Sequence, residues 1–137
     1  MYTQEETEAW IKGFFDVFDG LDPSRMPSIF TKTAFCKIAN EPNVVGIEAI
    51  QNHVTGMFSR LLNQSHKLVR LDTVRDGTGI YATLEITFTF KNHPEDPVTI
   101  PSLTYFERVP KGEEEGKVKT LMIYEDLGPV KEKIGGH

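Results

Sequence analysis

The sequence predicts a single α+β domain in which helices pack on one face of a strongly curved antiparallel sheet. The 137 residues have the length of one domain, so we expect one domain over residues 1–137. Apolar residues first recur at helical spacing, and from Ser65 onward they alternate with polar residues as in β-strands. Helices first and a long antiparallel meander afterwards is the order typical of an α+β domain.

The composition is that of a globular protein with an aromatic core and an acidic surface. Hydrophobic residues make up 39% of the chain, and 9 Phe, 4 Tyr and 1 Trp supply its aromatic side chains. The 15 Lys and Arg against 20 Asp and Glu give a net charge of −5, the wrong sign for neutralising phosphates. Nucleic acid is therefore not an expected partner.

The lone cysteine and the polar N-terminus favour a cytoplasmic location. Cys36 has no second cysteine with which to form an internal disulfide or a cysteine-based zinc site, so we expect a reducing compartment. The first ten residues are acidic and polar where a signal peptide would be basic and then apolar. No apolar run approaches the ~18 residues that span a bilayer, so we expect no membrane partner.

Two helical segments are predicted near the N-terminus. The first runs from Tyr2 to about Gly20 and opens with Thr3 and Glu6 at the spacing of a capping box. Its apolar residues recur at helical spacing: Trp10, Phe14, Val17, Phe18 and Leu21. The second segment, Ser24 to Phe30, is short and follows Pro23, because proline suits the first turn of a helix.

A short strand and a third helix follow. The strand is predicted over Thr33 to Ala39, and a turn-forming segment at 40–43 closes it. The helix begins after Gly46. Its apolar residues form one broad stripe: Ile47, Ile50, Val54, Met57, Phe58, Leu61 and Leu62.

Four strands are predicted in the second half of the chain. They cover His66 to Asp76, Ile80 to Phe90, Val98 to Val109 and Lys117 to Leu127. In the clearest of them, Ile80 to Phe90, one face is apolar and the other carries Glu85 between threonines. This pattern assigns the apolar face to the core and points Glu85 outward.

Three segments, in this order, carry a resemblance to a known family. They are 30–50 (FTKTAFCKIANEPNVVGIEAI), 98–101 (VTIP) and 116–129 (GKVKTLMIYEDLGP). Together they resemble the nuclear transport factor 2-like superfamily, in particular its SnoaL-like cyclase and limonene-epoxide-hydrolase-like branches. The resemblance covers essentially the whole chain and implies a cone-shaped, cystatin-like α+β roll that encloses a pocket. Members include isomerases, cyclases, hydrolases, dehydratases and binding modules, so the fold alone decides little about the chemistry.

The chain lacks most of the catalytic residues that the resemblance implies. Steroid-isomerase-like members carry a Tyr on the first helix, where this chain has Phe14, and acids at two strand positions that match apolar, Lys or Thr residues here. Of the epoxide-hydrolase-like constellation, only the acid of the last strand is kept, as Asp126. Its partner acid would lie near Glu85, and a register slip of one residue would move Glu85 to the opposite face.

Asp126 is the leading candidate for a proton-transfer residue. It follows the apolar run Leu121 to Tyr124, and loss of hydration there could raise its pKa and fit it for proton transfer. The alternative is an acid at a strand end that hydrogen-bonds nearby backbone groups. His53 or Tyr124 would assist, and Glu85 is a weaker catalytic candidate.

His53 lies at the edge of the apolar stripe of the third helix. From there a neutral imidazole could reach a pocket and move protons near pH 7, although a half-exposed helix histidine without a role is more common. No pair of histidines has metal-ligand spacing, so no metal is expected. Phosphate-binding and dinucleotide motifs do not occur in the sequence, so no cofactor is expected.

A cavity between the first and third helices and the sheet is expected to bind a small apolar metabolite. The candidate ligand-binding residues combine aromatic, aliphatic and sulfur-containing side chains: Phe14, Phe18, Cys36, Ile38, Val54, Phe58 and Met122. Aromatic residues at helical spacing are more often core, and residues around a cone-shaped pocket can serve both purposes. For Cys36 a buried structural thiol is the alternative.

Three functions are compatible with this pattern. The leading hypothesis is a SnoaL-like, cofactor-independent isomerase or cyclase that acts on an apolar metabolite by acid/base catalysis. The alternative is a noncatalytic member that binds a ligand or another protein, and the third is an epoxide-hydrolase-like enzyme using Asp126 and Glu85. A homodimer through the outer sheet face is also expected, from the resemblance and from the alternation of Leu121, Ile123 and Leu127 with charged residues.

Overall fold

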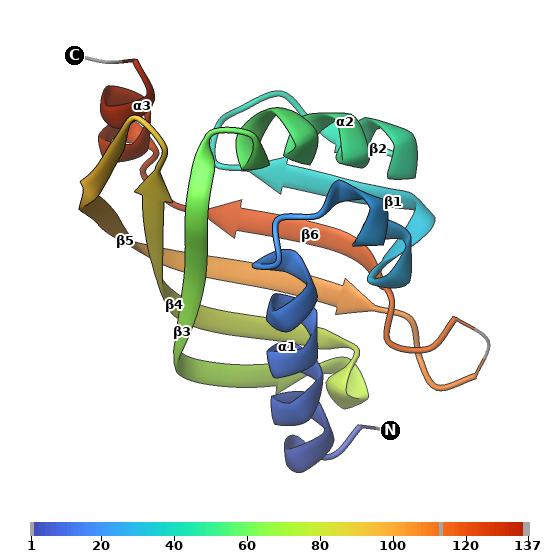
Figure 1. The fold of residues 1–137 in the computed structure, drawn as a ribbon. Coiled ribbons are helices and arrows are strands. Elements are labelled where there is room, and N and C mark those ends of the chain that lie inside the picture. The colour runs from blue at the N-terminus through green and yellow to red at the C-terminus, as the bar shows by residue number, and fades with distance from the viewer. Residues whose placement is uncertain (1, 113, 136–137) are drawn as a thin grey trace.

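The fold is a six-stranded sheet with helices packed against it (Figure 1). The structure is a computed structural model that describes residues 2–112 and 114–135. Its elements, with η for short 3-10 helices, are α1 (Gln4–Phe18), η1 (Pro23–Ser28), β1 (Phe30–Ile38), β2 (Val44–Val45), α2 (Ile47–Phe58), β3 (Leu61–Val74), η2 (Arg75–Gly77), β4 (Gly79–Phe90), β5 (His93–Arg108), β6 (Val118–Tyr124) and α3 (Gly128–Ile134). The predicted α+β class is confirmed. Within the described residues, no helix has the length and hydropathy needed to cross a membrane.

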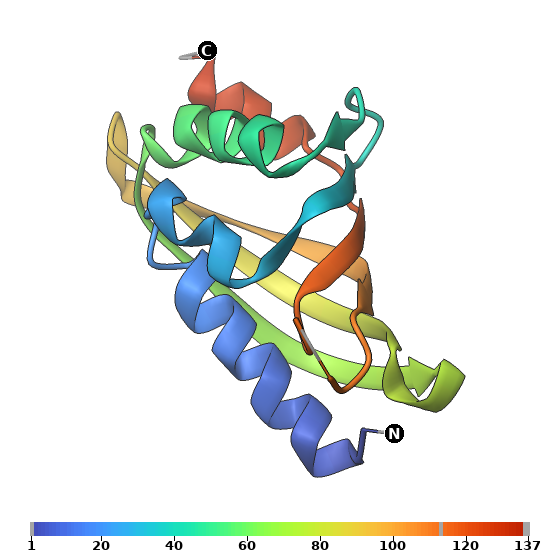
Figure 2. The ribbon, with the colours of Figure 1, turned by 90° about the vertical axis from the view of Figure 1, so that its right-hand side faces the viewer.

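The strand order is β2-β1-β6-β5-β4-β3, and the sheet is mixed. Neighbouring strands are antiparallel, as predicted, except β1 and β6, which run parallel and are separated in the chain by the other four strands. The sheet is strongly bent (Figure 2). In both views α2 and α3 lie at one end of the molecule, and the N-terminus lies at the other (Figures 1 and 2).

Alternation along β4 places one face of the sheet in the core, as the sequence indicates. Ile80, Leu84 and Phe88 are buried, whereas Glu85 points to the outer face. Because successive side chains of a strand point to opposite sides, the pairing of β4 with β3 and β5 extends these two faces over the meander.

The first helix forms as its capping residues predict. The Thr3 hydroxyl accepts from the Glu6 amide at 3.1 Å, and the Glu6 carboxylate accepts from the Thr3 amide at 2.8 Å. The inward face of α1 buries Ile11, Phe14 and Phe18. This helix therefore contributes an aromatic ridge to the core.

Phe14 is the centre of an aromatic cluster that joins α1 to the sheet. Its ring centroid lies 5.1 Å from Phe106 on β5, 5.8 Å from Phe30 on β1 and 5.7 Å from Trp10. The contacts with Phe30 and Phe106 are edge-to-face, a favoured arrangement of aromatic rings. The space around Phe14 is thus filled by other aromatic side chains.

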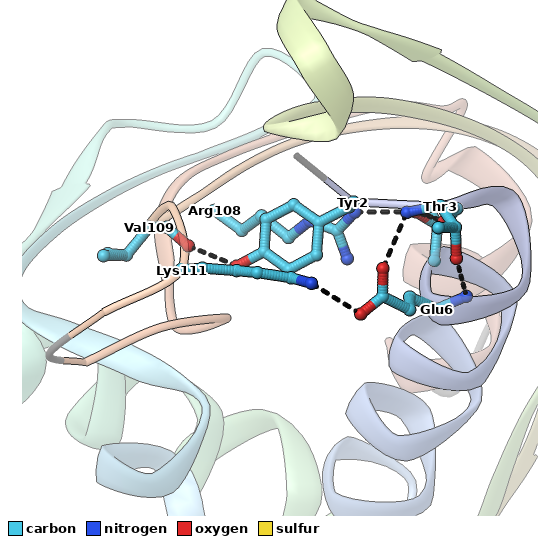
Figure 3. Close-up of polar contacts among 7 residues, drawn as sticks. Tyr2, Thr3, Glu6, Arg108, Val109 and Lys111 are labelled. Carbon is cyan, nitrogen blue, oxygen red and sulfur yellow. Dashed lines mark hydrogen bonds and ion pairs between the residues drawn. The ribbon is translucent and has the colours of Figure 1, made fainter.

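A buried arginine fixes the N-terminal residues to the sheet (Figure 3). Arg108, at the end of β5, donates from Nε to the Gly77 carbonyl at 2.9 Å and from Nη2 to the Thr7 hydroxyl at 2.7 Å. The Tyr2 ring centroid lies 3.6 Å from the guanidinium carbon, and the Tyr2 hydroxyl donates to the Val109 carbonyl at 2.7 Å. These contacts offset much of the cost of burying the charge.

An exposed ion pair lies beside this arginine (Figure 3). Lys111 Nζ donates to Glu6 Oε2 at 2.8 Å. The bond from Lys111, and then that from the Thr3 amide, lowers the pKa of Glu6 from 4.5 to about 2. Because the folded-state pKa is the lower one, the stabilisation is complete above pH 4.5 and is lost as the pH falls through about 2. Solvent exposure keeps the contribution of this pair small.

Three boundaries differ from the predicted ones for identifiable reasons. Leu61 and Leu62 belong to β3 and not to the helical stripe, because α2 ends at Phe58. β5 begins at His93, where the sequence predicts a proline-containing turn. Pairing of β6 with β5 begins only at Leu103, so the earlier half of β5 is an edge on that side, where proline is tolerated.

Two elements were not predicted. β2 is only two residues long, and it pairs with β1. The C-terminal helix α3 spans seven residues and starts at Gly128-Pro129, which the sequence pattern assigns to the end of the last strand. α3 matters for function because it covers part of the cavity described next.

Candidate active site

A cavity of about 440 Å³ lies between α2, α3 and the inner face of the sheet. Its wall is mainly apolar, with contributions from Phe18, Ile86, Phe88, Ile123 and Ile134. A volume of this size suits a small organic ligand. The polar residues of the wall are Glu41, His53, Arg60, Gln64, His66, Glu125 and Lys131.

Glu125 is the carboxylic acid that the last strand brings into this cavity. It directly follows β6, and its Oε1 is fully shielded from solvent, with no hydrogen-bond partner among the described residues. Burial raises the pKa of Glu125, and a polar contact from the Ser102 hydroxyl offsets part of that rise. An acid in this setting favours its neutral form and can donate a proton.

The register of β6 explains why the acid is Glu125 and not Asp126. Leu121 pairs with Cys36 of β1, and Ile123 pairs with Ile38, so these apolar residues face inward together. Side chains alternate along a strand, and Glu125 continues the inward set while Asp126 does not. The sequence contained this signal, because Leu121, Ile123 and Leu127 are the apolar set of the strand and Glu125 is the acid among them.

The prediction that Asp126 faces the cavity is wrong. Asp126 is exposed and is not part of the cavity wall. Its Oδ1 accepts from the Gly128 amide at 2.8 Å, at the start of α3. This is the structural role expected in the alternative interpretation of a strand-end acid.

Tyr124, Met122 and Glu85 also lie outside the cavity, contrary to the predicted site. The Tyr124 side chain is 53% exposed, and its hydroxyl contacts the Met122 sulfur at 3.9 Å on the outer face of the sheet. Glu85 is 3.7 Å from Lys67 on the same outer face. Asp126 and Glu85 therefore do not form the acid pair of an epoxide-hydrolase-like site.

The remaining candidates divide between the cavity wall and the core. His53, Phe18 and Ile38 line the cavity. Four others are buried without forming part of its wall: Phe14, Cys36, Val54 and Phe58. For Cys36, burial raises the pKa of the thiol to about 12, so it stays protonated as a structural side chain.

A hydrogen-bonded group on the opposite side of the cavity is not evident from the sequence. Asp19, the residue that ends α1, accepts at Oδ1 from His66 at 2.7 Å and from Gln64 Nε2 at 2.9 Å. His66 and Gln64 point inward from β3 and line the cavity. The residues are 45 and 47 positions from Asp19 in the chain, so no local motif reveals the group.

An ion pair between α3 and the segment after β1 borders the cavity. Lys131 of α3 lies 3.2 Å from Glu41, which follows β1, and both line the wall. This pair links α3 to the edge of the sheet. Over residues 2–112 and 114–135, no three His, Cys, Asp or Glu side chains are grouped as ligands for a metal ion.

Comparison with solved structures assigns the fold. A protein from Bacillus subtilis assigned as an isomerase superposes with a TM-score of 0.79 at 15% identity, over 100% of this chain and 98% of that one. SalBIII, described as an epoxide hydrolase/cyclase-like enzyme in pyran ring formation in the polyether salinomycin, gives a TM-score of 0.75 at 15% identity, over 94% and 97% of the two chains. A protein from Jannaschia sp. CCS1 assigned as a SnoaL-like polyketide cyclase gives 0.74 at 16%, over 100% and 98%.

The chain therefore has the nuclear transport factor 2-like fold, in the form found in SnoaL-like cyclases and epoxide hydrolase/cyclase-like proteins. Sordarin/hypoxysordarin biosynthesis cluster protein G of Sordaria araneosa is 26% identical to it over 129 residues, which cover 93% of this chain and 85% of that protein. No protein-family profile matches the sequence. The resemblance inferred from the three sequence segments is confirmed at the level of the fold.

Proposed function

We propose that the protein is a SnoaL-like enzyme that isomerises or cyclises a small apolar metabolite by acid/base catalysis in the cavity. The observation that carries this proposal is Glu125, a shielded carboxylic acid with a raised pKa in a mainly apolar wall. The fold of known cyclases and the relative named for a biosynthesis cluster support a role in secondary metabolism.

Glu125 acts as the proton carrier, the role that the sequence pattern assigns to Asp126. In its neutral form the carboxyl donates a proton to a basic atom of the substrate, and the apolar wall then favours return of a proton to the carboxylate. His53 lines the same cavity and is placed to assist. The apolar residues around them exclude water, which keeps a reactive intermediate from being hydrolysed.

Identification of the ligand tests this function against the noncatalytic alternative. The purified protein is extracted with organic solvent, and the extract is analysed by mass spectrometry. If the protein is an enzyme, we expect an apolar metabolite, and incubating it with fresh protein should yield an isomer of the same mass. A bound metabolite that is recovered unchanged, with no isomer formed, would favour a binding module.

We also propose that the protein forms a homodimer through the outer face of the sheet, but with other residues than those predicted. Leu121 and Ile123 face inward and cannot take part. The outer face instead presents Tyr81 and Leu103, which are 40% and 41% exposed, next to Tyr124. Leu103 pairs with Tyr124, and the Tyr81 ring contacts that of Tyr105, which lies two residues from Leu103 on the same face of β5. An apolar patch of this kind is costly to leave in water.

Leu103→Arg is expected to convert the dimer into a monomer, because it places one charge on each side of a symmetric apolar interface. The molar mass from light scattering at micromolar concentration checks this. Lys67→Arg, on β3 of the same outer face, keeps its charge and should leave the dimer intact. A monomeric molar mass for the wild-type protein would show that the proposed dimer does not form.

A further inference from the structure

A second, smaller hollow adjoins the cavity at the end of the molecule where α2 and α3 lie (Figure 1). Its volume is about 250 Å³, and it shares Arg60, Phe90 and Ile134 with the wall of the larger cavity. The rest of its lining is polar: Ser59, Lys91 and Asn92. This polar hollow therefore lies directly beside a mainly apolar cavity.

The pairing of two strands brings the two cations of the polar hollow together. Arg60 lies between the end of α2 and the first residue of β3, and Lys91 directly follows β4. Leu61 pairs with Phe90 in the antiparallel ladder, and the Lys91 amide donates to the Arg60 carbonyl at 2.9 Å. Arg60 and Lys91 are therefore neighbours across the two strands, although they are far apart in the sequence.

The polar hollow is positively charged. Arg60 and Lys91 are both exposed, and neither forms an ion pair with a carboxylate in residues 2–112 and 114–135. By contrast, both lysines of the neighbouring α3, Lys131 and Lys133, form ion pairs. None of the six lining residues of the hollow is acidic. Two positive charges therefore face a ligand at this end of the cavity.

The other polar groups of the hollow are already engaged in hydrogen bonds. The Ser59 hydroxyl donates to the Gly56 carbonyl at 2.7 Å, and Asn92 Nδ2 donates to the Lys133 carbonyl at 3.2 Å. The main donors for a ligand are thus a guanidinium, which can bind a planar carboxylate through two parallel N–H bonds, and an ammonium, which adds a point charge. This small donor set fits a carboxylate better than a phosphate group, which carries about two charges and needs more donors.

We infer that Arg60, with Lys91 beside it, binds a carboxylate at one end of the substrate, while the apolar cavity holds the body of the substrate. This inference rests on the proposed function and names its substrate class, an apolar metabolite that carries a carboxylate. Arg60 and Glu125 line the same cavity, so an ion pair at Arg60 fixes which end of the substrate lies at the rim and leaves the apolar body to meet the Glu125 carboxyl. Fixing one end in this way limits the orientations that the bound substrate adopts.

Binding of octanoate and octanol tests this inference without the natural substrate. The two compounds have the same apolar chain and differ in the head group, and isothermal titration calorimetry measures both dissociation constants. Wild-type protein is expected to bind octanoate more tightly than octanol. Arg60→Gln should weaken octanoate binding about 5-fold, the effect of losing one ion pair at a solvent-exposed rim, and leave octanol binding unchanged. Lys91→Gln should cause a smaller loss, because an ammonium lacks the fork geometry.

Arg25→Gln is the matched control. Arg25 is an exposed arginine of η1 that lines neither the cavity nor the polar hollow, so this variant should keep the wild-type affinity for octanoate. Added NaCl should weaken octanoate binding to the wild type more than to Arg60→Gln, since salt screens an exposed ion pair. Equal octanoate affinities of the wild type and Arg60→Gln would overturn the inference, as would the absence of octanoate binding. Tighter binding of octyl phosphate than of octanoate would overturn the choice of a carboxylate.

These outcomes are distinct from failure of the proposed function. If octanoate binds through Arg60 but the natural metabolite is recovered unchanged, the carboxylate site is present and the proposed isomerisation is wrong. If the metabolite is converted and Arg60→Gln keeps the wild-type KM for it, the proposed function stands and the inference about Arg60 fails.

Discussion

Glu125→Gln is expected to lower turnover of the cavity metabolite by about 100-fold or more. Glutamine keeps the shape of the side chain but has no proton of the right acidity to give, and general acids typically contribute at this scale. Affinity should change little, because the amide side chain would fill the same volume next to Ser102. Steady-state kinetics with the metabolite recovered from the protein would measure kcat and KM separately.

Asp126→Asn is the matched control for this variant. It changes the neighbouring acid in the same way, at a side chain that is exposed and accepts from the Gly128 amide. We expect turnover close to that of the wild type. Loss of turnover in Asp126→Asn together with normal turnover in Glu125→Gln would rule out Glu125 as the proton carrier.

Phe14→Ala is expected to reduce the free energy of unfolding by about 4 kcal/mol, in the range found for truncation of buried aromatic residues. The ring contacts Trp10, Phe30 and Phe106, so its removal leaves a cavity within the aromatic cluster. Urea unfolding followed by circular dichroism measures the loss. The midpoint of the transition should shift with little change in its slope.

Leu62→Ala is the control for Phe14→Ala. Leu62 is 55% exposed, so its truncation should change the stability by less than about 1 kcal/mol. The sequence pattern places Phe14 in the ligand-binding wall, whereas the structure places it in the core. Unchanged stability together with weaker ligand binding in Phe14→Ala would instead place Phe14 in the wall of the ligand cavity.

The fold was predictable because local patterns and tertiary packing agree in most elements. The capping box of Thr3 and Glu6 starts α1 where predicted, and the alternation from Ile80 to Phe90 gives the correct inward face of β4. α3 was missed because its stability comes from contacts with distant segments, among them the ion pair of Lys131 with Glu41. A seven-residue helix has little intrinsic stability of its own.

The site was less predictable than the fold because it depends on register and on long-range contacts. A shift of one residue on β6 separates Glu125 from Asp126, and family matching chose the residue on the wrong face. Hydrophobic alternation in the same strand would have chosen Glu125. The contact between Asp19 and His66 spans 47 positions and depends on how α1 crosses β3, which no periodicity in the sequence encodes.

The proposed role of Glu125 requires a carboxyl group with a raised pKa in the cavity, and ¹³C NMR of that carboxyl measures the pKa. Protein labelled at glutamate side-chain carboxyls is titrated, and Glu125→Gln assigns the signal. We expect a pKa above the ordinary glutamate value of 4.5, because burial penalises the carboxylate, and a further rise when an apolar ligand displaces water from the cavity. A pKa at or below 4.5 that does not respond to the ligand would rule out Glu125 as the proton donor of the cavity.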